Sequence, residues 1–161
     1  MRCILAFFVV LLLAFFAAPA PAADFAHLEA GTYATASWHS LGGAVDTGGG
    51  IFAELPLSSR VGLRLSAEAN SWKPTDYFVD RGWVDLRLYA PVSARAKLYG
   101  LAGFGYGRAG EDILARAGAG VEVFLAKLGP VQSKLFLEGS LQVSTGAYHA
   151  AALASGLSFG F

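Results

Sequence analysis

One short segment of the chain brings together side chains that can perform nucleophilic chemistry. Ser37 and His39 lie two residues apart in Ser37-Trp-His39-Ser40. If this segment is a strand, both side chains are on one face, where an imidazole can activate a hydroxyl for attack on an ester or amide. His149 is a third candidate. No strand carboxylate completes a triad, since Asp46 falls in a predicted loop, and the same histidines are also expected as polar residues at loop boundaries.

Other kinds of chemistry are not predicted. No group of residues has the spacing of metal ligands, and the glycines of Gly103-Phe-Gly105-Tyr-Gly107 indicate a strand that neighbours approach closely, not a nucleotide loop. The 12 basic and 12 acidic side chains give zero net charge without a Lys/Arg block, which excludes an electrostatic footprint for nucleic acid. We therefore expect no metal, no cofactor and no nucleic-acid partner.

The N-terminal residues 1–23 differ from the rest of the chain. Arg2 precedes an unbroken apolar run from Ile4 to Phe16, and Ala18-Pro-Ala-Pro-Ala-Ala23 is small and extended. The run is shorter than the ~20 residues of a spanning helix, and the pattern predicts a secretory signal peptide cleaved near Ala23. Residues 24–161 then form one domain without cysteine, because Cys3 leaves with the signal.

The remaining chain is dominated by apolar residues that alternate with polar or small ones. The clearest stretch is Ile113 to Leu125, and this period of two is typical of β-strands. Similar stretches predict eight strands: 28–38, 49–57, 61–70, 83–90, 96–106, 113–125, 135–143 and 151–161.

A short repeat indicates how these strands are connected. Pro56-Leu-Ser-Ser-Arg60, Pro91-Val-Ser-Ala-Arg95 and Pro130-Val-Gln-Ser-Lys134 are 35 and 39 residues apart, and each lies between two predicted strands. Proline ends a ladder and small polar residues turn the chain, so each repeat predicts a tight hairpin turn. Three short turns alternating with four longer loops are the connections of an all-β, eight-stranded, antiparallel up-and-down barrel with both ends on the short-turn side.

The charged residues of the predicted strands all fall on the face opposite the apolar one. They are Glu29, Glu54, Arg64, Glu68, Asp85, Arg87, Lys97, Arg116, Glu122 and Glu138. This pattern favours a transmembrane barrel with an apolar exterior and an interior in which unlike charges pair. A soluble barrel with the opposite orientation is not excluded by alternation alone.

The end of the chain carries a resemblance to a known family. Leu157, Phe159 and the terminal Phe161 alternate in a pattern that resembles the closing-strand signal of bacterial outer-membrane barrels, which the barrel-assembly machinery recognises. The segments 98–107 and 116–122 also resemble hairpins of small barrels of the OmpA and OmpX type. The resemblance spans residues 24–161 and implies an outer-membrane protein exported through the periplasm, without implying an activity.

Aromatic residues are predicted near the ends of the strands. Trp38, Trp72 and Tyr106 are expected to face the membrane interface at the long-loop side, whereas Trp83 and Tyr148 have the parity of inward residues. In the loop of residues 73–81, Tyr77 and Phe78 are the side chains most suited to contact a partner.

The sequence predicts architecture better than activity. We expect a monomeric structural or surface-interaction protein of the outer membrane that contacts lipid and lipopolysaccharide and has no wide pore. One alternative is a lipid A-modifying enzyme, because outer-membrane acyltransferases and deacylases are similarly small barrels. Their His-x-Ser order is absent here, where Ser37 precedes His39. A small gated channel is the other alternative.

Overall fold

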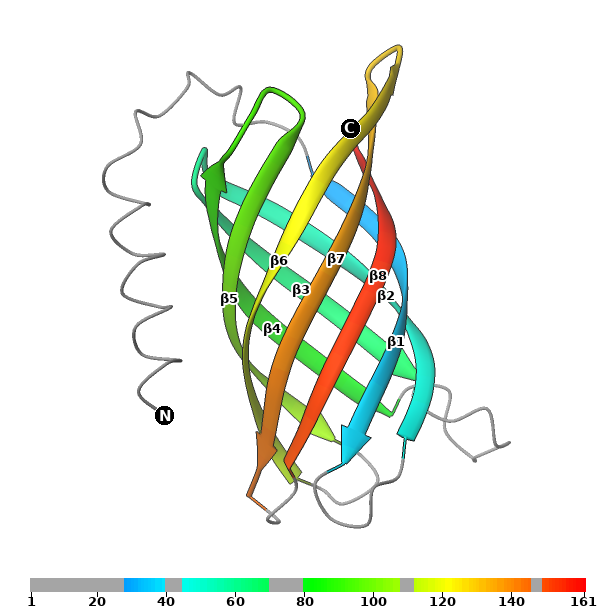
Figure 1. Cartoon of the computed structure of the whole chain (residues 1–161), viewed down its shortest axis with the longest axis vertical. Coiled ribbons are helices and arrows are strands. Elements are labelled where there is room, and N and C mark those ends of the chain that lie inside the picture. The colour runs from blue at the N-terminus through cyan, green and yellow to red at the C-terminus, as the bar shows by residue number, and fades with distance from the viewer. Residues whose placement is uncertain (1–27, 40–44, 70–79, 108–111, 146–148) are drawn as a thin grey trace.

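Eight antiparallel strands form a closed barrel in the computed structural model, which describes residues 28–39, 45–69, 80–107, 112–145 and 149–161 (Figure 1). Each strand pairs with its neighbours in the chain, and β1 pairs with β8 to close the sheet. The strands are β1 (Glu29–His39), β2 (Val45–Ser58), β3 (Val61–Ala69), β4 (Arg81–Pro91), β5 (Ala96–Gly107), β6 (Asp112–Leu128), β7 (Val131–Ser144) and β8 (His149–Gly160). The predicted eight-stranded up-and-down barrel is confirmed.

The connections alternate in length as the repeat predicted. The strands β2 and β3, β4 and β5, and β6 and β7 are joined by short turns, and the longer connections lie at the opposite end of the barrel. Glu29 pairs with Gly160, so both ends of the closed sheet lie on the short-turn side. Figure 1 shows the β6–β7 hairpin extending beyond the other strands on that side.

The strand β2 begins earlier than predicted. The sequence predicts a loop at residues 45–48. In the structure, Val45 instead pairs with Trp38, and Gly48 pairs with Thr35, in the ladder to β1. Glycines lower strand propensity locally, and here the backbone ladder overrides that preference. The consequence for the site is that Asp46 is a strand residue, not a loop residue.

Two copies of the Pro-containing repeat make the same turn. In each, the backbone N–H of the arginine donates to the serine hydroxyl two residues earlier, from Arg60 to Ser58 and from Arg95 to Ser93, both at 3.2 Å. Such a local hydrogen bond is typical of Ser/Thr turns. These residues form tight hairpin connections because the side-chain hydroxyl satisfies a backbone donor where the ladder stops.

The third copy of the repeat is used differently. Pro130 follows Gly129, which has a φ of 62° in the left-handed region that favours glycine, and the two residues form the turn itself. The strand β7 then begins at Val131, so Lys134 lies inside the strand, not at its start. The cation of this copy therefore does not precede a strand, unlike Arg60 and Arg95, which come directly before β3 and β5.

Inward glycines make room for large aromatic rings. A Cβ added at Gly120 would lie 2.4 Å from the ring of Tyr99, and one added at Gly105 would lie 2.6 Å from that of Trp83. Real Cβ atoms do not approach other atoms this closely. The aromatic ring from one strand therefore occupies the space that a side chain at the glycine of the neighbouring strand would need.

Several predictions fall on residues outside the described ranges. They concern the signal peptide of residues 1–23, Trp72, Tyr148 and loop residues 73–79. No helix among the described residues is long and apolar enough to cross a membrane.

Candidate functional site

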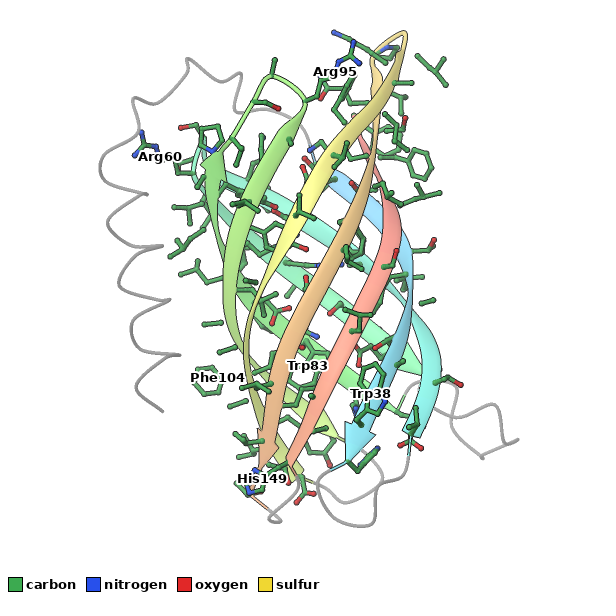
Figure 2. The ribbon with its side chains drawn as sticks, in the orientation of Figure 1. Trp38, Arg60, Trp83, Arg95, Phe104 and His149 are labelled. Atoms are coloured by element: carbon green, nitrogen blue, oxygen red, sulfur yellow. The ribbon has the colours of Figure 1, made fainter. Side chains whose placement is uncertain are left out.

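The interior of the barrel is charged and its outer surface is apolar. Many large apolar side chains point outward, among them Ile51 and Phe104, which are 62% and 71% exposed. The charged side chains that point inward are buried: Glu54, Arg64, Glu68, Asp85, Arg87, Arg116, Glu122, Lys134 and Glu138. This is the reverse of a soluble protein, in which exposed surface is polar and the core is apolar. Figure 2 shows Phe104 projecting away from the barrel wall.

The interior contains three groups in which an arginine and a tyrosine share one glutamate. In the first, Arg64 Nη1 lies 3.1 Å from Glu138 Oε2, and the Tyr99 hydroxyl donates to the same oxygen at 3.0 Å. The three residues come from β3, β7 and β5, so they connect opposite parts of the wall. Tyr99 was not among the predicted network residues.

The second group lies nearer the short turns. Arg87 Nη1 lies 2.5 Å from Glu54 Oε2 and donates to the Tyr89 hydroxyl at 2.8 Å. That hydroxyl in turn donates to Glu54 Oε1. The glutamate therefore receives a hydrogen bond on each oxygen, which a buried carboxylate needs in order to remain charged without a large penalty.

The third group lies nearer the long loops. Arg116 Nη1 contacts Glu68 Oε1 at 3.4 Å, and the Tyr33 hydroxyl donates to the same oxygen at 2.9 Å. Arg116 also holds Asp85 in a two-point contact, with Nε donating to Oδ1 at 2.7 Å and Nη2 to Oδ2. The planar guanidinium suits such bidentate binding of a carboxylate.

Each of these arginines also lies over an aromatic ring. The Cζ atom of Arg64 is 3.8 Å from the ring centroid of Phe52, that of Arg87 is 3.6 Å from Tyr99, and that of Arg116 is 4.3 Å from Trp83. A cation over a ring face is stabilised electrostatically, and the effect increases when water is excluded. The predicted inward position of Trp83, which is 2% exposed, is consistent with this contact.

Lys134 completes the charged interior at the short-turn end. Its Nζ contacts Glu29 and lies 3.0 Å from Glu122. The sequence repeat predicts a turn at this lysine. However, the lysine has the same parity as Phe136 and Glu138, and this parity indicates an inward strand residue. Continuing the alternation backwards from Leu135 would have identified it.

Lys97 lies at the rim, outside the paired interior. Its side chain is exposed, with Nζ 5.5 Å from the ring centroid of Tyr89. The prediction that Lys97 belongs to the buried network is wrong, because β5 begins at Ala96 and the lysine is therefore at the open end of the barrel.

The predicted serine and histidines are only partly brought together. Ser37 and His39 both point inward near the long loops, and His39 Nε2 lies 2.7 Å from Asp46 Oδ2 on β2. A carboxylate on a neighbouring strand is therefore present beside His39, because Asp46 belongs to β2 and not to a loop as the sequence predicts. Ser37, however, is only 1% exposed.

His149 does not approach this pair. The strands β1 and β8 are neighbours as predicted, but His39 pairs with Ala150, so His149 has outward parity and is exposed. His149 therefore lies on the opposite face from His39, because adjacent strand residues point to opposite faces. Figure 2 shows His149 at the long-loop end of the barrel. Among the described residues, no group of His, Cys, Asp and Glu could hold a metal ion.

The outward aromatic residues lie near the two ends of the strands. Trp38 and Tyr106 are 46% and 52% exposed near the long loops. Phe159 and Phe161 are 40% and 56% exposed at the short-turn end, and Leu157 points outward on the same strand as Phe159. These positions are those of aromatic residues at the two interfaces of a membrane barrel.

Comparisons with known proteins agree with the fold. No family model matches the chain, and no curated protein matches it. A solved structure described as a de novo designed transmembrane β-barrel is similar, with 19% identity, a TM-score of 0.56, and coverage of 86% of this chain and 98% of that one. Ail, the attachment invasion locus protein of Yersinia pestis, has 13% identity and a TM-score of 0.44, with 84% and 97% covered.

The fold and the distribution of side chains together define a class of protein. The chain is a closed eight-stranded barrel with the architecture of a small transmembrane β-barrel.

Proposed function

We propose that the chain is an integral outer-membrane β-barrel protein with a structural or surface-interaction role, in which the barrel anchors the long loops and forms no wide pore. The observation that carries the proposal is the distribution of polarity: charged side chains are buried inside and large apolar ones are exposed outside. In water such an exterior would drive aggregation, whereas in a bilayer it is solvated by lipid.

The backbone supports the same placement. A bilayer offers no hydrogen-bond partners to the backbone, and a closed barrel satisfies its backbone groups internally because it has no edge strand. The strands are 9 to 17 residues long, and about 9–11 residues suffice for a tilted strand to cross the hydrocarbon core. The C-terminal alternation of Leu157, Phe159 and Phe161 supports assembly by the barrel-assembly machinery.

The ion pairs support a closed interior. Eight strands enclose a space that side chains just fill. Arg64, Arg87 and Arg116 each contact a glutamate from another strand, at 3.1, 2.5 and 3.4 Å. Opening a water-filled path would separate these charges in the middle of the barrel, so we expect the interior to stay closed at rest.

The membrane placement can be tested by tryptophan quenching. One variant keeps only Trp38, with Trp72 and Trp83 replaced by Phe, and a matched variant keeps only Trp83. In vesicles that contain brominated lipid, we expect strong quenching of Trp38 and weak quenching of Trp83. Strong quenching of Trp83 with protection of Trp38, in protein whose circular dichroism is that of β-sheet, would contradict the proposed orientation.

Single-channel recording separates the closed barrel from a gated channel. We expect the purified protein in a planar bilayer to show no stepwise conductance over a wide range of voltage. The variant Glu138→Ala/Arg64→Ala, which removes one cross-barrel pair with its charges balanced, should leak more than the wild type. Reproducible steps from the wild type would favour the gated channel.

A lipid A-modifying enzyme is the second candidate function. The contact of 2.7 Å between His39 and Asp46 favours it, because a carboxylate orients the imidazole in many hydrolases and acyltransferases. The burial of Ser37 opposes it, since a nucleophile must reach its substrate. We would compare lipid A mass spectra of envelopes without the protein, with it, and with His39→Ala. A change in acyl chains that depends on His39 would establish the enzyme.

A further inference from the structure

Basic side chains gather at the short-turn end of the barrel. Arg60 is in the turn between β2 and β3, Arg95 and Lys97 are at the turn between β4 and β5, and Lys127 is near the turn between β6 and β7. Every short hairpin therefore carries at least one cation. We call these four residues the basic collar. Figure 2 shows Arg60 and Arg95 at this end.

Three members of the basic collar are exposed at the rim of the barrel. Arg95, Lys97 and Lys127 are exposed. The inference rests on these three residues and not on Arg60, which is half-buried.

The opposite charge is missing from the outside of this end. Among the described residues, the acidic side chains toward this end are Glu29, which points inward to Lys134, and Glu54 and Glu122, which are buried inside the barrel. The described acidic residues Asp46, Asp80 and Asp112 instead lie at the long-loop end, at the starts of β2 and β6 and just before β4. The described rims therefore differ in charge: the short-turn side carries the basic collar, whereas the long-loop end carries Asp46, Asp80 and Asp112 together with Arg81.

Exposed apolar side chains accompany the cations. Val92 is 64% exposed in the turn that contains Arg95, and Leu128, next to Lys127, is 73% exposed. Leu98, next to Lys97, is 44% exposed. Apolar contact beside a cation is the arrangement of a membrane-water interface, where the stem of Lys or Arg lies along the apolar region and its charge reaches the phosphates.

The turns hold these cations in a defined place. Because the N–H of Arg95 donates to the Ser93 hydroxyl, and Arg60 and Ser58 repeat the arrangement, two hairpins present an arginine from the same kind of turn. The sequence repeat therefore reverses the chain direction and also places an arginine at this end of the barrel.

We infer that the basic collar binds the head groups of anionic phospholipids in the leaflet at the short-turn side of the membrane. The inference rests on the proposed membrane placement and adds to it a lipid class and a side. Head-group phosphates that carry a net negative charge would lie at the level of Arg95, Lys97 and Lys127, whereas a zwitterionic head group offers no net charge to attract.

The test measures lipid selectivity of the reconstituted full-length protein by electron paramagnetic resonance. The protein is placed in phosphatidylcholine vesicles with a trace of spin-labelled phosphatidylglycerol or spin-labelled phosphatidylcholine, and the motionally restricted fraction of each label is determined. We expect roughly a threefold preference for phosphatidylglycerol at low salt, which should fall at higher ionic strength as the charges are screened.

Two triple variants provide the comparison. R95Q/K97Q/K127Q should lose the preference, and R95K/K97R/K127R, which keeps the charges, should retain it. Equal restriction of both lipids by the wild type, or a preference that survives in the Gln variant, would overturn the inference. Absence of any restricted lipid of either kind would instead contradict the membrane placement, so the two failures are distinguishable.

Discussion

The Cζ atom of the Arg87 guanidinium lies 3.6 Å from the ring centroid of Tyr99, and the hydroxyl of the same tyrosine donates to Glu138 at 3.0 Å. Tyr99 thereby joins two ion pairs, one formed by Arg87 with Glu54 and one by Arg64 with Glu138. The five residues come from β2, β3, β4, β5 and β7. These five residues therefore form one connected unit, and we expect substitutions within it to be non-additive.

Removing the hydroxyl of Tyr99 should cost less than removing the charge of Glu138. Tyr99→Phe keeps the ring under Arg87 and loses one hydrogen bond, which we expect to lower the free energy of unfolding by about 1–1.5 kcal/mol. Glu138→Gln leaves Arg64 without its counter-ion in a buried place, and a cost of about 3–5 kcal/mol is expected. Urea unfolding in lipid vesicles measures both. Equal costs for the two variants would show that the ion pair adds nothing beyond the hydrogen bond.

The inward and outward glycines of neighbouring strands should respond differently to alanine. A Cβ at Gly120 would lie 2.4 Å from the Tyr99 ring and 2.6 Å from the carbonyl oxygen of Leu137, whereas one at Gly139 would meet nothing within 4 Å. Gly120→Ala should therefore lower the free energy of unfolding by about 1–3 kcal/mol, as overpacking does.

Gly139→Ala is the matched control for that substitution and should be close to neutral. Both changes add one methyl group to a strand, and they differ only in the face on which it lies. The same unfolding assay applies. A larger cost at Gly139 than at Gly120 would contradict the assignment of inside and outside.

A charge on the outer surface should oppose folding in lipid. Ala119 lies on the outward face of β6, where it pairs with Gly100 and Gly139. Ala119→Arg should lower the free energy of unfolding in a bilayer by about 2–4 kcal/mol if the residue lies near the midplane. The measurement is the folded fraction as a function of urea in phosphatidylcholine vesicles. Unchanged folding would mean that the outer surface does not face lipid.

Deletion of Phe161 should affect assembly in cells more than stability. Its backbone N–H donates to the Leu28 carbonyl at 3.1 Å, and it follows the last residue of β8, so its loss falls at the end of the sheet and the purified protein should unfold almost as the wild type does. If the terminal aromatic residue is read by the barrel-assembly machinery, the amount of folded protein in the outer membrane should fall severalfold. Heat-modifiable mobility in gel electrophoresis measures that amount, and normal assembly without Phe161 would argue against the family resemblance.

The face on which each strand residue lies could be predicted from the chain alone. Alternation assigned Arg64, Glu68 and Asp85 to the face opposite their apolar neighbours, and all three are buried inside the barrel. The period of two is a local property of a strand, since successive side chains point to opposite faces whatever the strand pairs with. The number of strands followed from the same local signal and from the turn residues between them.

Which charge meets which could not be predicted in this way. Glu29 contacts Lys134 across 105 positions of sequence, and Glu138 is shared by Arg64 and Tyr99 from different strands. These contacts depend on strand stagger and tilt, which are properties of the closed sheet as a whole. The contact between His39 and Asp46 likewise depends on the pairing of β1 with β2, which continues to Val45.

One physical cause separates what the sequence determines from what only the tertiary structure decides. Local alternation and turn chemistry determine that this chain makes strands, how many it makes and which side chains share a face. Closure of the sheet decides which distant strands face one another, and it brings Arg64 of β3 to Glu138 of β7 and Lys134 of β7 to Glu29 of β1, because those distances exist only once β8 has paired with β1.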